Sequence, residues 1–168
     1  MAINHPEKVK SLVLVNTGGF VSWGATSKFF ARLLSVPSLN RWIMPSIVHR
    51  YMSPQSAIDT EIANRVAEMV KTAEGSGIAA SLWKSFLDPS YDLRSQANQI
   101  KAPVLIIWGK RDPIIPLTVR HATQNALAGS RFEIVDTGHV VFSSKPEEFL
   151  QIIEPFIEEI LGDQVTES

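Results

Sequence analysis

The sequence contains no cysteine, and this absence removes three kinds of chemistry at once. A chain without cysteine forms no disulfide scaffold, no thiolate metal site and no cysteine nucleophile. Long hydrophobic runs are also absent: the longest clean apolar stretch is Val104–Trp108, far short of the roughly 20 residues that a membrane-spanning helix needs. Residues 1–10 carry charges but contain no apolar h-region, so no secretory signal is predicted. These absences predict a cytoplasmic protein with no membrane partner.

A surplus of charge of one sign is missing too. The 168 residues include 16 basic and 17 acidic side chains, which gives a formal net charge of −1. Because nucleic-acid binding needs a basic face, we expect no nucleic-acid partner. No group of residues has metal-ligand spacing and no glycine-rich phosphate loop follows a strand, so neither a metal site nor a phosphate-binding loop is predicted. The apolar share of 45% is enough for the core of one ordinary domain.

Three short apolar runs predict the strands of a sheet: residues 11–16, 104–108 and 132–135. The first two are continuously apolar, which is typical of parallel strands that are covered on both faces. A buried helix can show the same pattern, but the branched residues and the flanking Gly, Pro and Asn favour strands. Helical patterns over residues 116–127 and 145–161 complete the prediction of an α/β fold with a three-stranded parallel sheet and flanking helices.

A long helical insertion separates the first predicted strand from the other two. We expect residues 1–19 to form the first strand region of the core, residues 20–90 the insertion, and residues 91–162 the rest of the core. Gly162 is expected to end the last helix, which leaves residues 163–168 as a flexible polar tail. Within the insertion, Gly75-Ser76-Gly77 is interpreted as a turn that breaks a helix.

Two residues that follow predicted strands are candidates for proton transfer. Asp112 comes shortly after the run ending at Trp108, and His139 comes shortly after the third run. The carboxyl ends of neighbouring parallel strands lie at one edge of the sheet, where open α/β sheets bind ligands. A carboxylate that accepts a hydrogen bond from imidazole Nδ1 leaves the other ring nitrogen free to act as a general base. The alternative is that Asp112 caps the following helix and His139 simply occupies a turn.

The sequences of these segments resemble those of a known enzyme family. Residues 5–17 resemble the segment that leads into the sixth strand of α/β-hydrolase-fold enzymes. Residues 100–113 resemble the seventh strand with the triad acid, and residues 132–139 the eighth strand with the triad histidine. Pro146–Phe149 resembles the start of the final helix. The resemblance implies the C-terminal part of an α/β-hydrolase fold, with residues 20–90 as an inserted helical cap, and a cofactor-free Ser-Asp-His triad in which Asp112 is the acid and His139 the base.

The sequence departs from this family in its nucleophile. The family's serine lies in a G-x-S-x-G elbow, and no such motif occurs in these residues. The first five strands and both oxyanion donors are missing with it, so we expect an internal start, a truncation or one piece of a split enzyme that is inactive alone. Ser144 stands where the family often has glutamate. Asn16 stands after the sixth strand, where some members place the acid, and an amide cannot be the anionic partner.

Substrate and partners are predicted only coarsely. The resemblance implies that cap aromatics line the pocket for a small apolar substrate, and the candidates are Trp23, Phe29, Phe30 and Trp42; the alternative is that they only pack. The first strand lacks a neighbour on one side, so we expect a homodimer or a complex with a missing N-terminal hydrolase half. The resemblance is consistent with an ester-like substrate. Amide, epoxide, haloalkane and carbon–carbon hydrolases, peroxidases and acyltransferases share these motifs, and a non-catalytic module that oligomerises through its sheet edge is the alternative class.

Overall fold

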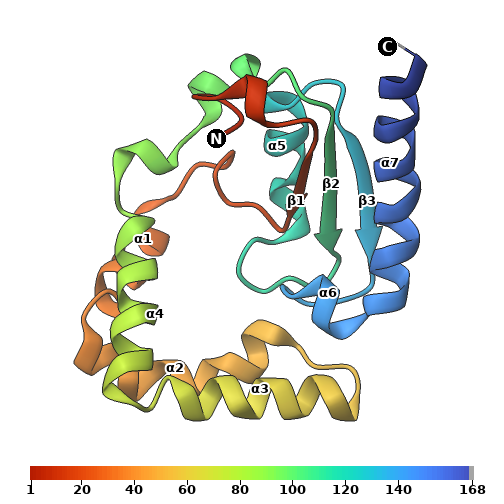
Figure 1. Cartoon of the computed structure of the whole chain (residues 1–168). Helices are drawn as coiled ribbons and strands as arrows, with labels where there is room; N and C mark the ends of the chain where they lie inside the picture. The colour runs from red at the N-terminus through yellow and green to blue at the C-terminus, as the bar shows by residue number, and fades with distance from the viewer. Residues whose placement is uncertain (167–168) are drawn as a thin grey trace.

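The computed structural model describes residues 1–166, which form a small sheet with flanking helices and a separate group of helices beyond one end of the sheet (Figure 1). Among these residues the sheet has three parallel strands in the order β1 (Leu12–Val15), β2 (Val104–Gly109) and β3 (Arg131–Val135). This is the α/β sheet that the apolar runs predict. All three arrows point toward the helical group, so the carboxyl ends of the strands face it.

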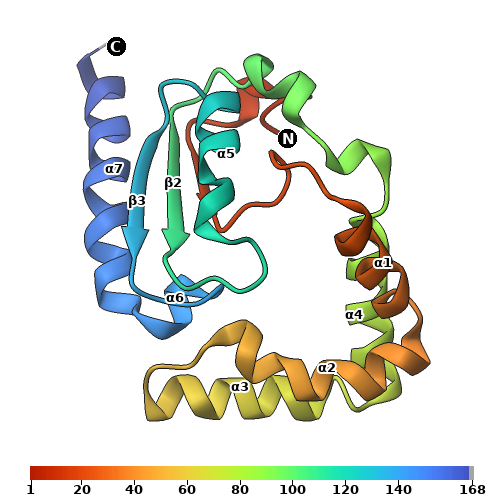
Figure 2. The same cartoon turned by 180° about the vertical axis from the view of Figure 1, so that it is seen from behind.

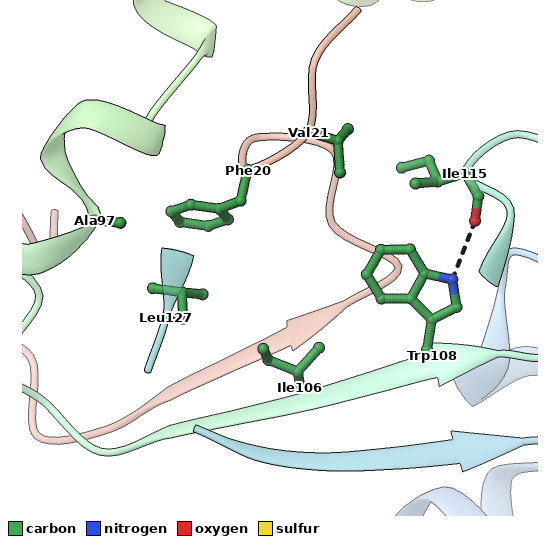
Figure 3. Packing of buried hydrophobic residues seen from close by; sticks show 7 residues of the cluster. All are labelled: Phe20, Val21, Ala97, Ile106, Trp108, Ile115 and Leu127. Carbon is green, nitrogen blue, oxygen red and sulfur yellow. Dashed lines mark hydrogen bonds between the residues drawn. The ribbon is translucent and has the colours of Figure 1, made fainter. Parts of the chain in front are cut away.

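Alternate residues of β2 enter two different cores. Ile106 and Trp108 pack on one face of the sheet with Phe20 and Ile115, as Figure 3 shows. Leu105 and Ile107 pack on the other face, against the last helix. These four β2 side chains are fully buried, since strand neighbours point to opposite faces and both faces are covered. The continuous apolar run of β2 therefore follows from its central position.

Helices cover both faces of the sheet. One face carries the short η4 (Leu117–Val119) and α5 (Arg120–Ala126), and the other carries α7 (Pro146–Thr166), as both views show (Figures 1 and 2). The single-turn α6 (Val141–Ser144) connects β3 to α7 at the carboxyl end of the sheet. Three short 3-10 turns lie elsewhere: η1 (Pro6–Lys8), η2 (Pro89–Tyr91) and η3 (Arg94–Gln99).

The end of the chain differs from the expectation. α7 continues past Gly162 to Thr166, so most of the predicted tail, residues 163–168, is helical; residues 167–168 lie outside the described residues. A glycine inside a helix costs only about 1 kcal/mol relative to alanine, which a long packed helix tolerates. A helix ends at glycine when the backbone there turns left-handed, and composition alone does not reveal that.

Four α-helices lie between β1 and β2 within residues 20–90, a segment that we call the cap. Its helices are α1 (Ala25–Leu34), α2 (Pro37–Met52), α3 (Ala57–Met69) and α4 (Ala73–Ser85). They bury a core of their own around Leu34, Met44 and Val48. The cap contributes no strand to the described sheet, and it faces the carboxyl ends of the strands (Figure 2).

The prediction of a turn at Gly75-Ser76-Gly77 is wrong. These residues lie inside the first turns of α4, which begins at Ala73. Thr72 is the N-cap, and its hydroxyl accepts a hydrogen bond from the Gly75 N–H at 3.0 Å. A threonine cap satisfies the free N–H groups of a helix start, and this outweighs the low helix propensity of two glycines.

Candidate active site

The carboxylate of Asp112 and the imidazole of His139 are in contact at the carboxyl end of the sheet. Asp112 Oδ2 lies 2.7 Å from His139 Nδ1. The Asp112 side chain is fully buried, whereas 18% of the His139 side chain is exposed. Asp112 follows β2 and His139 follows β3, which are neighbouring strands. The pairing of these strands brings together two residues that one helix and one strand separate in the sequence.

Asp112 uses its second oxygen to hold its own loop. Oδ1 accepts hydrogen bonds from the N–H groups of Ile114 at 2.7 Å and Ile115 at 3.0 Å. The indole Nε1 of Trp108 donates to the Ile115 carbonyl at 3.0 Å and ties the same loop to β2 (Figure 3). One oxygen of Asp112 thus holds a turn of its own loop while the other faces the histidine. Asp112 does not cap the following helix, because the N-cap positions of η4 and α5 are Pro116 and Val119.

The loops after β2 and β3 continue to pair beyond the strands. The Lys110 N–H donates to the Val135 carbonyl at 2.8 Å, and the Arg111 N–H donates to the Thr137 carbonyl at 2.9 Å. These bonds extend the sheet register almost to Asp112 and His139. Two well-paired loops restrict where the carboxylate and the imidazole can lie.

The cap contacts the histidine loop directly. The ring of Tyr51, at the end of α2, lies 4.5 Å from the His139 ring between centroids. A side chain at Gly138 would clash with Ser53 and would lie 2.7 Å from the Met52 carbonyl, so the end of α2 rests on this glycine. Burial, and then the nearby negative charge of Asp112, raise the pKa of Tyr51 to about 12. Tyr51 is therefore a protonated hydroxyl at neutral pH.

A second contact joins the cap to the core near the histidine. Ser143, in α6, donates its hydroxyl to Asp59 Oδ1 at 2.6 Å. Asp59 lies in the first turn of α3 and is fully buried, and its Oδ2 accepts from the Gln55 N–H at 3.0 Å. Asp59 and Ser143 are 84 positions apart in the sequence.

A cavity of about 480 Å³ lies between the cap and the sheet and reaches His139. The β1 residues Val13, Leu14 and Val15 form one wall. Most of the other lining side chains are apolar, and the described lining residues include no Asp, Glu, Lys or Arg. The side chains with polar groups among them are Asn16, Thr17, Trp23, Tyr51, Trp83, Tyr91 and His139. The cavity therefore suits an uncharged, largely apolar molecule.

The predicted aromatic lining is only partly in place. Trp23 lines the cavity and packs against Phe86 and Tyr91, with ring centroids 5.3 and 5.9 Å apart. Phe29, Phe30 and Trp42 are absent from the described lining and are exposed, Trp42 to 86%. Helical spacing places an aromatic on a face of its helix but does not tell which face the cavity adjoins. The prediction for these three residues is therefore corrected.

Sequence reasoning missed further residues around the pair. The sequence marks Asn16 only as a residue that cannot be the anionic partner, and no motif marks Tyr51. Asn16 is nevertheless 3% exposed and bonded to the histidine loop. The S-x-x-D pattern at Ser56 marks the start of α3, where Ser56 Oγ accepts from the Asp59 N–H, but nothing in the sequence indicates the bond to Ser143.

Residues 1–166 lack three features: a partner for the Ser144 hydroxyl, a group of metal-ligating side chains, and a membrane-spanning helix. Ser144, where the family often has glutamate, is buried, and its hydroxyl has no hydrogen-bond partner in that range. The described residues contain no group of three or more acidic, histidine or cysteine side chains placed to hold a metal ion. Nor does this range include a helix with both the length and the hydrophobicity that crossing a membrane requires.

The profile of the Ndr family matches residues 1–160. The chain belongs to the Ndr family. This Ndr-family chain is 25% identical over 173 aligned residues to a poly(3-hydroxyalkanoate) depolymerase of Ectopseudomonas oleovorans, covering 94% of the chain and 56% of that protein. It is 24% identical to a pimeloyl-[acyl-carrier protein] methyl ester esterase of Neisseria meningitidis, covering 97% of the chain and 54% of that protein. It therefore spans just over half the length of these relatives.

Solved structures show the same fold. A thermophilic esterase from Thermogutta terrifontis superposes with a TM-score of 0.75 at 18% identity, covering 95% of the chain and 59% of the esterase. The α/β hydrolase MGS-M2, from a deep-sea metagenome library, also reaches 0.75 at 21% identity, covering 92% of the chain and 58% of that protein. The Ndr-family chain thus has the α/β-hydrolase fold that the sequence resemblance implies.

Proposed function

We propose that this chain supplies the acid and the base of a hydrolytic triad, Asp112 and His139, to a serine nucleophile that lies outside residues 1–168. The observation that carries the proposal is the 2.7 Å contact between a fully buried carboxylate and an imidazole that borders a cavity. A cytoplasmic location stays a prediction.

The geometry fits a general-base role for His139. When Nδ1 donates to Asp112 Oδ2, the proton of the neutral ring is fixed on Nδ1, and Nε2 is left to accept a proton. Removing a proton from a serine hydroxyl, and later from water, converts the ring to an imidazolium, which the buried carboxylate stabilises. Asp112 keeps its position because its other oxygen is held by two backbone N–H groups.

The nucleophile must then come from another polypeptide segment. The sequence has no G-x-S-x-G motif, and the described cavity-lining residues include no serine. Within residues 1–166, β1 pairs with β2 on one side only. An open parallel edge next to the cavity is where a strand carrying the nucleophile would pair. We therefore propose a complex with, or a direct link to, an N-terminal hydrolase half.

An uncharged ester with an apolar acyl group is the proposed substrate class. The described lining residues carry no carboxylate, ammonium or guanidinium group, so a charged substrate would lose hydration without gaining an oppositely charged partner among them. One of the similar proteins is named as a methyl ester esterase and another as a poly(3-hydroxyalkanoate) depolymerase, and these names agree with the proposed class.

The first experiment uses the purified 168-residue chain with an activated ester and a serine-directed fluorophosphonate probe. We expect no turnover above the buffer rate and no labelling. Rapid turnover or stoichiometric labelling would show that the nucleophile lies within these residues and would overturn the assignment of an external serine.

The second experiment supplies the nucleophile. The nucleotide sequence preceding the Met1 codon is read for a frame that encodes a strand and a G-x-S-x-G elbow, and the joined polypeptide is expressed. We expect ester turnover that falls about a million-fold in His139→Gln and about ten-thousand-fold in Asp112→Asn. His121→Gln and Asp136→Asn, two exposed positions, are the matched controls and should change the rate less than twofold. Equal rates in all four variants would refute the triad roles.

The open edge of β1 also supports the alternative function, a non-catalytic module that oligomerises. The four β1 residues are only half-buried, although their sequence is that of a covered strand. Light scattering distinguishes the two readings. A stable homodimer of this chain, with no probe labelling after the upstream segment is added, favours the module, whereas a monomer that binds the upstream segment favours the enzyme.

A further inference from the structure

Asn16 lies immediately after β1, at the same end of the sheet as Asp112 and His139. It is 3% exposed, and its backbone is left-handed, with φ of 44°. Asparagine adopts this conformation more readily than most residues, because its short polar side chain bonds locally. A buried polar side chain in an unusual backbone conformation calls for an explanation from its hydrogen bonds.

The carboxamide of Asn16 bonds to two different strand ends. Its Oδ1 accepts from the N–H of Gly109, the last residue of β2, at 2.7 Å. Its Nδ2 donates to the His139 carbonyl at 2.6 Å and more weakly to the Gly138 carbonyl at 3.4 Å. A backbone donor on one side and backbone carbonyls on the other leave a single orientation for the amide.

These bonds connect the backbones that carry the acid–base pair. Gly109 starts the loop that holds Asp112, and the second partner is the peptide of His139 itself. One rigid amide therefore spans from the end of β2 to the histidine. If the His139 peptide moved away, the Nδ1–Oδ2 contact of 2.7 Å would lengthen, and the preference of the ring for a proton on Nδ1 would fall.

We propose that Asn16 is a positioning residue for His139: its carboxamide fixes the histidine peptide relative to the end of β2, so that the ring meets Asp112 with its proton on Nδ1. This inference rests on the proposed function, since it concerns the same acid–base pair. It does not require a nucleophile or a substrate, so the chain alone can test it.

Asparagine carries both the acceptor for the Gly109 N–H and the donor for the His139 carbonyl, whereas aspartate carries only acceptors. Aspartate has the same shape and can still accept from Gly109, but at neutral pH it has no N–H to donate to the His139 carbonyl. Its second oxygen would face two carbonyl oxygens and be repelled by them. Asn16→Asp therefore breaks the bond to His139 while leaving the bond to Gly109 in place.

The test measures which ring nitrogen of His139 carries the proton, from the 15N chemical shifts of the imidazole at a pH where the ring is neutral. In the wild type we expect the Nδ1–H form to dominate. In Asn16→Asp we expect the ratio of the Nδ1–H to the Nε2–H form to fall by about tenfold or more, the equivalent of losing one buried hydrogen bond. Asn16→Gly, which tolerates the left-handed backbone and removes both bonds, should give the same fall.

Asn40→Asp is the matched control, because Asn40 is also fully buried but lies in the cap, where it donates to the Leu34 carbonyl. It should lower the melting temperature and leave the His139 proton ratio unchanged. A ratio within twofold of wild type in Asn16→Asp and Asn16→Gly overturns the positioning role. So does the failure of both variants to fold while Asn40→Asp folds, since Asn16 would then be structural only. A wild-type ring protonated on Nε2 would instead refute the acid–base pair itself.

Discussion

The hydrogen bond between Ser143 and Asp59 should anchor the cap to the core, and Ser143→Ala tests its contribution. The substitution removes the donor to Asp59 Oδ1 at 2.6 Å and leaves a fully buried carboxylate oxygen without it. A hydrogen bond to a charged group contributes about 1.5–3 kcal/mol. We therefore expect the free energy of unfolding to fall by that amount.

The expected change is large enough for thermal denaturation. For a chain of this size, 1 kcal/mol corresponds to about 2–4 °C in melting temperature, so Ser143→Ala should lower it by about 3–12 °C. Ser81→Ala is the matched control, because among the described residues the Ser81 hydroxyl donates to the Gly77 carbonyl of its own helix, on an exposed part of α4. Alanine favours a helix more than serine does, so the control should melt at or slightly above the wild-type temperature.

A double-mutant cycle assigns the loss to the contact itself. In an Asp59→Ala background the acceptor is gone, and Ser143→Ala should then cost less than about 0.5 kcal/mol. Hydrogen exchange of the α3 amides should increase in Ser143→Ala if the cap opens more often. A melting temperature for Ser143→Ala that equals that of Ser81→Ala, or a cost that does not depend on Asp59, would refute the anchor.

Two more predictions concern other residues where the cap meets the core, Gly138 and Tyr51. Gly138→Ala would push a methyl group against Ser53, and it should destabilise the protein by about 1–3 kcal/mol in urea unfolding. Gly77→Ala, where an added methyl group meets no described atom within 4 Å apart from its chain neighbours and nearby helix backbone, should instead stabilise α4 by about 0.5–1 kcal/mol. The folded-state pKa of Tyr51, about 12, exceeds its unfolded value of 10.0, so stability should fall as pH rises between these values. Spectrophotometric titration should show a phenol titrating near 12 that disappears in Tyr51→Phe, leaving Tyr91; an unchanged curve would contradict the assignment.

The local sequence pattern was enough to predict the sheet and to place Asp112 and His139 at the same end of it. The apolar run of β2 is continuous because the strand is covered on both faces, and that burial leaves a direct mark in the sequence. Asp112 and His139 each follow a strand closely, and neighbouring parallel strands must end at the same edge. Their meeting follows from chain connectivity and therefore needs little tertiary information.

Local pattern failed where a residue's role depends on what packs against it. Trp42 and Trp23 are the same residue type in the same cap, yet Trp23 lines the cavity while Trp42 is 86% exposed. Gly75 looks like a helix breaker, but the Thr72 hydroxyl caps the helix that contains it. Gly162 does not end α7, which continues to Thr166.

The amino-acid order by itself determined the strands, the helical character of the cap and the two residues that face each other at the sheet end, because each leaves a periodic or positional trace along the chain. Only the folded arrangement decided that Asn16 bridges Gly109 and His139, that Tyr51 packs on the imidazole and that Asp59 meets Ser143. These contacts join segments far apart in the sequence, and hydrogen bonds and ring contacts between distant segments have no periodicity to reveal them.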